Sequence, residues 1–168
     1  MNNREKEFLA HIDKHKGIIH KVARMYMDHP EDREDLFQEI ILQLWKSYDH
    51  FQGESLFSSW MYKVSLNTAL TYFKKEKRKP DRHGLSPEME VAEDKSDSEK
   101  ETQLDYFYRA VQELSPVEKA LIFLFLEGQS HKDIAVNLGI TEGNARVKLT
   151  RTKERLQEII KRQGYEFR

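Results

Sequence analysis

Residues 130–156 read SHKDIAVNLGITEGNARVKLTRTKERL, and this stretch decides how the rest of the chain is interpreted. It predicts a short helix, a tight turn at Gly139-Ile140 and a longer helix with Thr141 as its N-cap. At about 100° per residue, the longer helix has an inward face and an outward face. The inward face holds Ala145, Leu149, Thr152, Leu156 and Ile159, and the outward face holds Gly143, Arg146, Val147, Thr150 and Arg151. This arrangement is typical of a helix-turn-helix.

The outward face suits entry into the major groove of DNA. Arginine can make paired hydrogen bonds to guanine, and Gly143 has no side chain to obstruct the approach. Lysine and arginine are also ordinary surface residues, so the alternative is a solvated basic helix within a bundle. Spacing and caps together favour the DNA-binding interpretation.

Helical periodicity extends over almost the whole chain, and no strand pattern is present. A first stripe begins at Phe8 and ends near Pro30, and a second helix carries Leu36. A third helix is expected from about Phe57 to Lys79. Helical spacing resumes at Leu104, and the apolar stripe of Ala120, Leu121 and Leu124 follows the start signal Ser115-Pro116. We therefore expect an all-α fold.

The segment 80–102 separates two helical domains, which we place at 1–79 and 103–168. It contains two prolines, many acids and few large apolar side chains, so it cannot offset its chain entropy by burial. We expect it to be a flexible acidic linker. Charge changes along the chain, because residues 60–82 hold seven basic and two acidic residues, whereas residues 131–162 hold eight basic and four acidic ones.

Composition limits the other possible functions. The chain of 168 residues contains no cysteine, which excludes disulfides, thiol catalysis and cysteine-ligated zinc, and this suits a cytoplasmic location. No apolar run approaches the roughly 20 residues that span a bilayer, so we expect no membrane insertion. Seven scattered histidines and exposed carboxylates indicate neither a metal site nor an acid–base pair. We expect a protein that is not an enzyme and uses no cofactor.

Aromatic and basic residues alternate on the third expected helix. Trp60 and Phe73 are more typical of a core, whereas the places of Tyr62 and Tyr72 stay open. Rings that stack on bases beside cations that neutralise phosphates are typical of single-strand nucleic-acid binding. The segment Lys74-Lys75-Glu76-Lys77-Arg78-Lys79 supplies the cations.

Several further motifs follow one another along the chain. They are Asp35-Leu36-Phe37-Gln38-Glu39, residues 51–67, Leu114-Ser115-Pro116-Val117-Glu118 and residues 134–151. The first resembles the polymerase-binding helix, the second the promoter-melting segment, and the last two the second DNA-binding domain of the sigma-70 family of bacterial RNA polymerase sigma factors. The short length and the missing middle domain resemble the extracytoplasmic-function (ECF) group. The resemblance implies a region 2 bundle and a region 4 helix-turn-helix that together direct promoter-specific initiation.

The resemblance also implies site residues and partners. Core polymerase would be bound through Asp35, Leu36, Gln38 and Glu39. The minus-ten element and its melted non-template strand would contact Phe51, Ser55, Trp60, Lys63, Asn67, Lys74 and Lys75. Double-stranded DNA of the minus-thirty-five element would contact Lys132, Arg146, Val147, Lys148, Thr150 and Arg151, with Lys148 and Arg151 on phosphates. Because members of this family usually have an anti-sigma factor, the resemblance also implies one as a partner.

The chain departs from the family pattern at four positions. Thr71 stands where an acid is usual and Lys74 where an arginine is usual, which puts the usual minus-ten contacts in doubt. Ala145 and Thr152 replace a more common valine and alanine in the expected core of the last helix.

Two other classes of function remain as alternatives. One is a dimeric helix-turn-helix regulator that binds a palindromic operator without polymerase. The other is a helical adaptor that binds only proteins, with its basic faces serving solubility.

Overall fold

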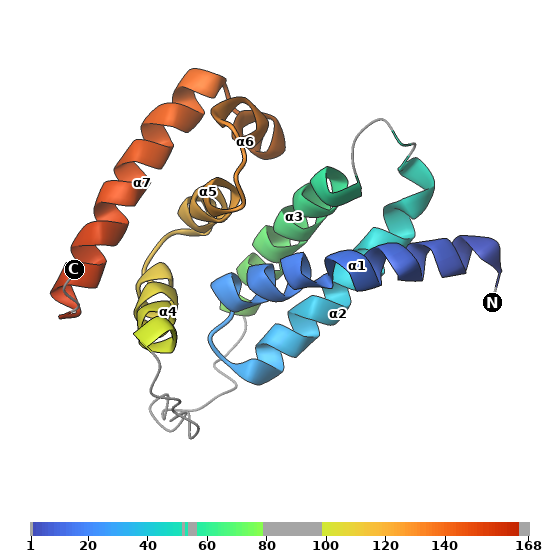
Figure 1. Cartoon of the computed structure of the whole chain (residues 1–168), viewed down its shortest axis with the longest axis horizontal. Helices are drawn as coiled ribbons and strands as arrows, with labels where there is room; N and C mark the ends of the chain where they lie inside the picture. The colour runs from blue at the N-terminus through green and yellow to red at the C-terminus, as the bar shows by residue number, and fades with distance from the viewer. Residues whose placement is uncertain (1, 52, 54–56, 79–98, 165–168) are drawn as a thin grey trace.

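The computed structural model describes residues 2–51, 53, 57–78 and 99–164, and every regular element in these ranges is helical. The elements are α1 (Asn3–Tyr26), α2 (Pro30–Ser47), the 3-10 helix η1 (Tyr48–His50), α3 (Phe57–Arg78), α4 (Glu99–Val111), α5 (Pro116–Leu126), α6 (His131–Leu138) and α7 (Glu142–Arg162). Figure 1 shows α1, α2 and α3 on one side of the molecule and α4 to α7 on the other. We call these the N-terminal bundle and the C-terminal bundle. The prediction of an all-α fold with two helical units is confirmed.

The N-terminal bundle packs three helices around one apolar core. Its completely buried residues include Ile19, Val22, Leu36, Ile40, Leu44, Met61 and Ala69. The turn from α1 into α2 is held by Arg33, whose Nε donates to the Met27 carbonyl at 2.9 Å and whose Nη2 donates to that of Asp28 at 2.8 Å. Pro30 then starts α2, where a missing N–H costs no helical hydrogen bond.

Aromatic rings close the end of this bundle where η1 leads toward α3. The Phe8 ring centroid lies 5.0 Å from that of Trp45 and 5.1 Å from that of Tyr48. Phe51 and Trp60 lie 5.1 Å apart in the same cluster. Such ring pairs add attraction beyond the burial of their area. The cluster therefore fixes where the chain leaves α2 and enters α3.

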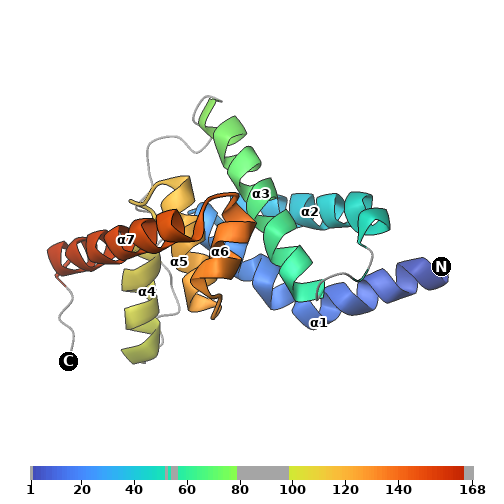
Figure 2. The same ribbon diagram turned by 90° about the horizontal axis from the view of Figure 1, so that it is seen from above.

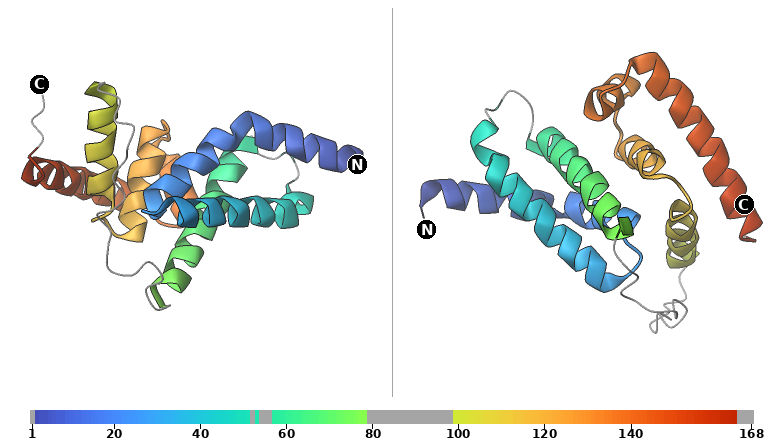
Figure 3. Two further views of the ribbon diagram at one scale, coloured as in Figure 1. Left: turned by 90° about the horizontal axis from the view of Figure 1, so that it is seen from below. Right: turned by 180° about the vertical axis from the view of Figure 1, so that it is seen from behind.

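The middle of helix α5 is buried on every side, whereas Val117, Phe125 and Leu126 near its ends are exposed. Ser115 and Glu118 form a capping box at its start, with Pro116 as its first residue, as the start signal predicts. All six residues from Lys119 to Leu124 are buried, whereas the predicted stripe covered only part of them. An all-round apolar helix needs neighbours on both sides. Here α7 packs on one side and α1 and α3 on the other, as the opposite views in Figures 1 and 3 show.

The contact of α5 and its neighbours with α1 and α3 joins the two bundles, and we call it the seam. Its N-terminal side consists of Lys21, Tyr26, Tyr62 and Phe73, and its C-terminal side of Gln112, Lys119, Phe123 and Glu127. The view from above in Figure 2 also places α5 and α6 against α1 and α3. Buried residues of both bundles form one continuous core cluster.

The expected linker falls mostly outside the described residues, which omit 79–98. Helix α4 begins at Glu99, inside the segment 80–102 that the sequence assigns to the linker. The boundaries 1–79, 80–102 and 103–168 stay a prediction.

Candidate nucleic-acid interface

Three local signals shape the helix-turn-helix. Ser130 caps α6 by accepting a hydrogen bond from the Asp133 amide at 3.1 Å, and Gly139 ends that helix in the left-handed region at φ 69°. Only glycine adopts this conformation without a steric cost. Thr141 then caps α7 by accepting from the Asn144 amide at 3.1 Å. The predicted turn and both predicted caps at Gly139 and Thr141 are confirmed.

Helix α7 places its two faces as the periodicity predicts. Ala145, Leu149, Thr152 and Ile159 are buried, and Leu156 is half-buried. The residues on the outward face are exposed, namely Gly143, Arg146, Val147, Lys148, Thr150 and Arg151. The α6 residue Lys132 is exposed as well. All six residues expected at the minus-thirty-five element are thus open to a DNA partner.

The two unusual residues in the core of α7 fit without strain. Ala145 is completely buried, and the hydroxyl of Thr152 donates to the Lys148 carbonyl at 2.7 Å. A buried hydroxyl that makes a hydrogen bond avoids the free-energy cost of an unsatisfied buried donor. On the outward face, Arg146 Nη2 lies 3.4 Å from Glu142 Oε1, an exposed pair that leaves the guanidinium accessible.

A polar stripe runs along α3. Lys63, Asn67, Thr71 and Lys74 follow one another at helical spacing, and all four are exposed. Such a stripe carries hydrogen-bonding groups beside cations, which suits bases and phosphates of a nucleic acid. The structure therefore brings three of the expected minus-ten residues, Lys63, Asn67 and Lys74, onto one accessible face.

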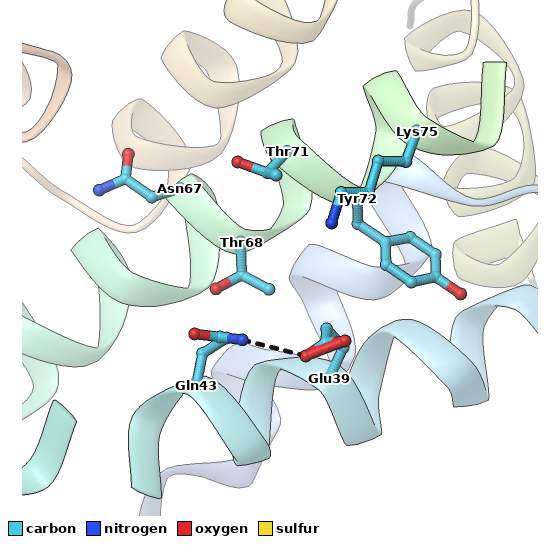
Figure 4. Close-up of a pocket in the computed structure, with 7 residues that line it drawn as sticks. All are labelled: Glu39, Gln43, Asn67, Thr68, Thr71, Tyr72 and Lys75. Atoms are coloured by element: carbon cyan, nitrogen blue, oxygen red, sulfur yellow. Dashed lines mark hydrogen bonds between the residues drawn. The ribbon is translucent and has the colours of Figure 1, made fainter. Parts of the chain in front are cut away.

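A groove of about 290 Å³ lies beside this stripe, between α2 and α3. Figure 4 shows that the groove is lined by Asn67, Thr68, Thr71, Tyr72 and Lys75 of α3 and by Glu39 and Gln43 of α2, with Thr68 pointing toward the two α2 side chains. Gln43 Nε2 donates to Glu39 Oε2 at 3.1 Å. The groove thus offers a carboxylate, two amides, hydroxyls, a ring and an ammonium group, which can recognise the edge of a base and a neighbouring phosphate.

Phe51 and Trp60, both expected to contact melted DNA, belong to the aromatic cluster. They are half-buried and pack on each other, so the structure gives both a packing role and a partly accessible surface. Ser55 lies outside the described residues. Of the other aromatic positions, Phe73 lies in the seam, and Tyr62 also lies there.

The expected polymerase-binding residues divide over three environments. Asp35 and Gln38 are exposed on α2. Leu36 is completely buried, so its expected direct contact with a partner is corrected: the side chain supports α2 from beneath because it faces the bundle core. Glu39 is half-buried and lines the groove beside α3.

Sequence reasoning missed three groups at these surfaces. Gln43 and Thr68 belong to the groove, and Leu42, one turn after Gln38, is 44% exposed. Helical spacing on α2 could have found Gln43, because it lies one turn after Glu39. Exposure of a leucine on an otherwise acidic face gives no signal in a single sequence.

Two other kinds of site are absent from the described ranges. No cluster of three or more histidine, cysteine or acidic side chains there could hold a metal ion. Within the same ranges, no helix combines the length and apolar character that crossing a membrane requires.

Family models match most of the chain in two parts. The model described as Sigma-70 region 2 matches residues 11–79, and the model described as Sigma-70, region 4 matches residues 104–156. The first match covers α1 from His11 onward, α2 and α3, and the second runs from Leu104 in α4 to Leu156 in α7.

Curated relatives carry ECF names. The chain is 27% identical to the ECF RNA polymerase sigma factor SigG of Mycobacterium tuberculosis over 92% of its own length, and it spans only 46% of that protein. It is 26% identical to the ECF RNA polymerase sigma-E factor of Escherichia coli, over 85% of this chain and 84% of the relative. The chain thus spans less than half the length of the SigG relatives.

Two solved structures share the fold. One contains the sigma factor RpoE with the anti-sigma factor NepR from Bartonella quintana, with a TM-score of 0.73 and 24% identity, covering 93% of this chain and 98% of that one. The other contains CnrH with the cytosolic domain of CnrY, with a TM-score of 0.67 and 15% identity, covering 94% and 89%.

Proposed function

We propose that this chain, which belongs to the ECF group of the sigma-70 family, binds core RNA polymerase and directs promoter-specific initiation of transcription. The observation that carries the proposal is that the two matched regions follow each other in the chain and that each exposes a surface suited to DNA, the polar stripe of α3 in the first and the outward face of α7 in the second. Residues 1–79 would bind polymerase and the minus-ten element, 80–102 would connect, and 103–168 would bind the minus-thirty-five element. The phosphodiester chemistry belongs to the polymerase, so the chain itself acts as a non-enzymatic factor.

The C-terminal bundle reads double-stranded DNA in this proposal. Arg146, Val147 and Thr150 lie near the N-terminal end of α7, the end that helix-turn-helix proteins insert into the major groove. Arg146 contacts base edges, whereas Lys148 and Arg151 contact phosphates and supply affinity that does not depend on sequence. Lys132 on α6 provides a further phosphate contact from the side of the groove.

The N-terminal bundle captures the melted strand. The α3 stripe and the groove beside it present Asn67, Thr71 and Lys75 together with Gln43 of α2. Bases that leave the duplex bind to such side chains and to the partly exposed rings of the aromatic cluster, which offsets an unstacking cost of a few kcal/mol. Thr71 replaces the acid that is usual in the family, so this surface carries one negative charge less. Lys74 replaces the usual arginine and keeps the positive charge.

Core polymerase docks on α2. Asp35 and Gln38 are exposed, and the exposed Leu42 follows Gln38 by one turn, so an acidic and polar surface with one apolar side chain at its end is available. This composition suits a basic partner surface, because charge complementarity raises the rate and specificity of association.

An anti-sigma factor is a further proposed partner. Both similar solved structures are complexes, one with the anti-sigma factor NepR and one with the cytosolic domain of CnrY. A sigma factor works on chromosomal DNA with polymerase, so we place the chain in the cytoplasm, and its lack of cysteine suits that compartment.

In vitro transcription with core polymerase and a genomic DNA library tests the proposed function. We expect the chain to produce a limited set of mapped start sites that share a minus-ten and a minus-thirty-five sequence element. The same set of starts with and without the chain would contradict it. Binding to a palindromic operator without polymerase would support a dimeric regulator instead, and failure to bind any DNA, with or without polymerase, would support a protein-binding adaptor.

A further inference from the structure

The first two turns of α1 lie ahead of the residues that the region 2 model matches, yet they pack on the N-terminal bundle. The Asn2 side chain caps the helix by accepting from the Glu5 amide at 2.8 Å. Phe8 on the second turn is only 3% exposed and packs on the rings of Trp45 and Tyr48. These turns therefore contact the place where α2 passes into η1.

Arg4 lies over the same two rings and connects them to the residue that follows. Its guanidinium carbon is 4.7 Å from the ring centroid of Trp45 and 5.5 Å from that of Tyr48. The guanidinium nitrogen Nη2 forms an ion pair with Asp49 Oδ1. Arginine suits this place, because its planar group can stack on a ring and pair with a carboxylate at the same time. Arg4 thus links α1 to the end of α2 and to η1.

The 3-10 helix η1 depends on contacts of this kind. It has only three residues, Tyr48–His50, and the side chain of Ser47 before it makes no capping hydrogen bond. The hydrogen bonds of 3-10 helices have poorer geometry than those of α-helices, so a short one holds its orientation weakly by itself. The Phe51 amide donates to the Tyr48 carbonyl at 3.1 Å and ends the turn. The aromatic rings and the ion pair of Arg4 therefore decide how η1 is oriented.

The orientation of η1 in turn sets the position of Phe51. The rings of Tyr48 and Phe51 are nearly parallel, with centroids 6.4 Å apart and an angle of 13° between their planes. Phe51 also packs on Trp60, and both of these rings are half-buried. A ring can stack on an unpaired base only when its free surface faces the strand. A change in η1 is therefore transmitted to the rings that are expected to contact melted DNA.

We propose that Arg4 is a positioning residue for the capture of the melted non-template strand, because it fixes η1 and, through η1, the ring of Phe51. This role rests on the proposed function, since it requires that the N-terminal bundle binds unpaired promoter DNA. Arg4 acts without touching the DNA. Its ion pair with Asp49 is exposed to solvent and contributes little to stability, so loss of Arg4 changes strand capture more than it changes unfolding.

Binding of a single strand to the complex of the chain with core polymerase tests this role. The probe is a fluorescent oligonucleotide with the non-template minus-ten sequence of a promoter mapped by in vitro transcription. Arg4→Ala removes the stacking and the ion pair, Arg4→Lys keeps the charge, and Asp49→Asn removes only the ion pair. Lys6→Ala is the matched control, because Lys6 is an exposed cation in the same turn of α1.

We expect Arg4→Ala to weaken binding of the strand about three- to tenfold, Arg4→Lys to weaken it less, and Lys6→Ala to leave it unchanged. The affinity for core polymerase and the urea-unfolding midpoint should stay near those of the original chain. Asp49→Asn should also weaken binding, although the loss of a negative charge near DNA would by itself strengthen it. Equal affinity of Arg4→Ala and the original chain would overturn the role, and unchanged or tighter binding by Asp49→Asn would overturn the part of the ion pair.

The salt dependence distinguishes positioning from direct contact. A cation that neutralises a phosphate of a single strand contributes roughly 0.7 to the slope of log affinity against log salt. We expect the same slope for Arg4→Ala and for the original chain. A slope smaller by that amount would make Arg4 a phosphate contact and would contradict the positioning role.

A second measurement needs neither polymerase nor DNA. The chain has two tryptophans, and Trp45→Phe leaves Trp60 as the only one while it keeps a ring beneath Arg4. In this background we expect Arg4→Ala to increase the quenching of Trp60 fluorescence by acrylamide, because Phe51 no longer covers Trp60 as closely. Unchanged quenching would show that Arg4 does not act on the rings beside α3.

The positioning role and the proposed function fail in different ways. If the complex with the original chain yields no mapped start sites, the proposed function is wrong, whereas the quenching of Trp60 still decides whether Arg4 orients the aromatic cluster. If start sites are found and Arg4→Ala captures the strand as well as the original chain does, the proposed function stands and the positioning role is wrong.

Discussion

The Tyr62 hydroxyl donates a 3.0 Å hydrogen bond to Glu127 Oε1, across 65 positions of the chain and between two helical bundles. Burial first, and then the bond to Glu127 and the charge of that carboxylate, raise the pKa of Tyr62 from 10.0 to about 12. All three causes favour the neutral phenol in the folded protein. The titration of one tyrosine therefore reports on the contact between the bundles.

We expect the contribution of this contact to stability to be present below pH 10 and to decline as pH rises from 10 to about 12. The reason is that an unfolded chain releases the phenol proton near 10.0, whereas the folded one retains it until about 12. Titration of tyrosinate by ultraviolet absorbance should lose its step near 12 in Tyr62→Phe. In Glu127→Gln that step should move to lower pH. Superimposable curves for all three proteins would show that Glu127 does not act on Tyr62.

Tyr26→Phe should lower the free energy of unfolding by about 1–3 kcal/mol, because the Pro116 carbonyl loses its 2.7 Å partner in a buried environment. Urea unfolding followed by circular dichroism measures the change. Tyr108→Phe is the matched control, since it also removes a hydroxyl but keeps the ring on which Arg24 stacks at 4.1 Å. An equal loss in both variants would mean that the bond from Tyr26 is not the cause.

Asp35→Lys should weaken binding to core polymerase without unfolding the chain, because Asp35 is an exposed acid on the proposed docking surface. A pull-down titration measures the affinity, and circular dichroism checks the helices. Asp13→Lys, at an exposed acid of α1, provides a control for the change in net charge. Unchanged affinity for Asp35→Lys would remove this residue from the docking surface.

Arg146→Ala should cost about 1–3 kcal/mol at the preferred promoter and relax preference at one base position. Arg151→Ala should weaken all sequences alike and reduce the salt slope by about one unit, as expected for a phosphate contact. Binding of the complex with polymerase to single-base promoter variants, at several salt concentrations, separates the two. If Arg146→Ala lowers affinity equally for every variant, Arg146 is a phosphate contact as well.

The sequence predicts elements well where the signal is local. The opposite faces of α7, with Ala145 inside and Arg146 outside, follow from helical spacing, and Gly139 and Thr141 mark the helix ends through their own backbone chemistry. The seam has no such signal. Glu127 belongs to a segment that the sequence shows only as a helix break, and the place of Tyr62 stays open until the α5 helix covers it. Leu36 belongs to the motif that resembles the polymerase-binding helix, yet its side chain faces the core. A sequence motif alone does not tell which of its residues contact a partner and which support the helix from beneath.

The wide sequence separation of the seam contacts has a consequence for the order of folding. Tyr26 reaches Pro116 across 90 positions, and Lys21 reaches Glu127 across 106. Contacts between residues so far apart in sequence form slowly, because the long loop between them must close before the contact can stabilise the fold. During synthesis on the ribosome, α1, α2 and α3 emerge well before α5, so the aromatic residues on the N-terminal side of the seam are at first not covered by α5. During that interval the rings of Tyr26 and Phe73 lack the α5 neighbours that cover Tyr26 completely and Phe73 in part in the folded protein, which favours aggregation of the unfinished chain.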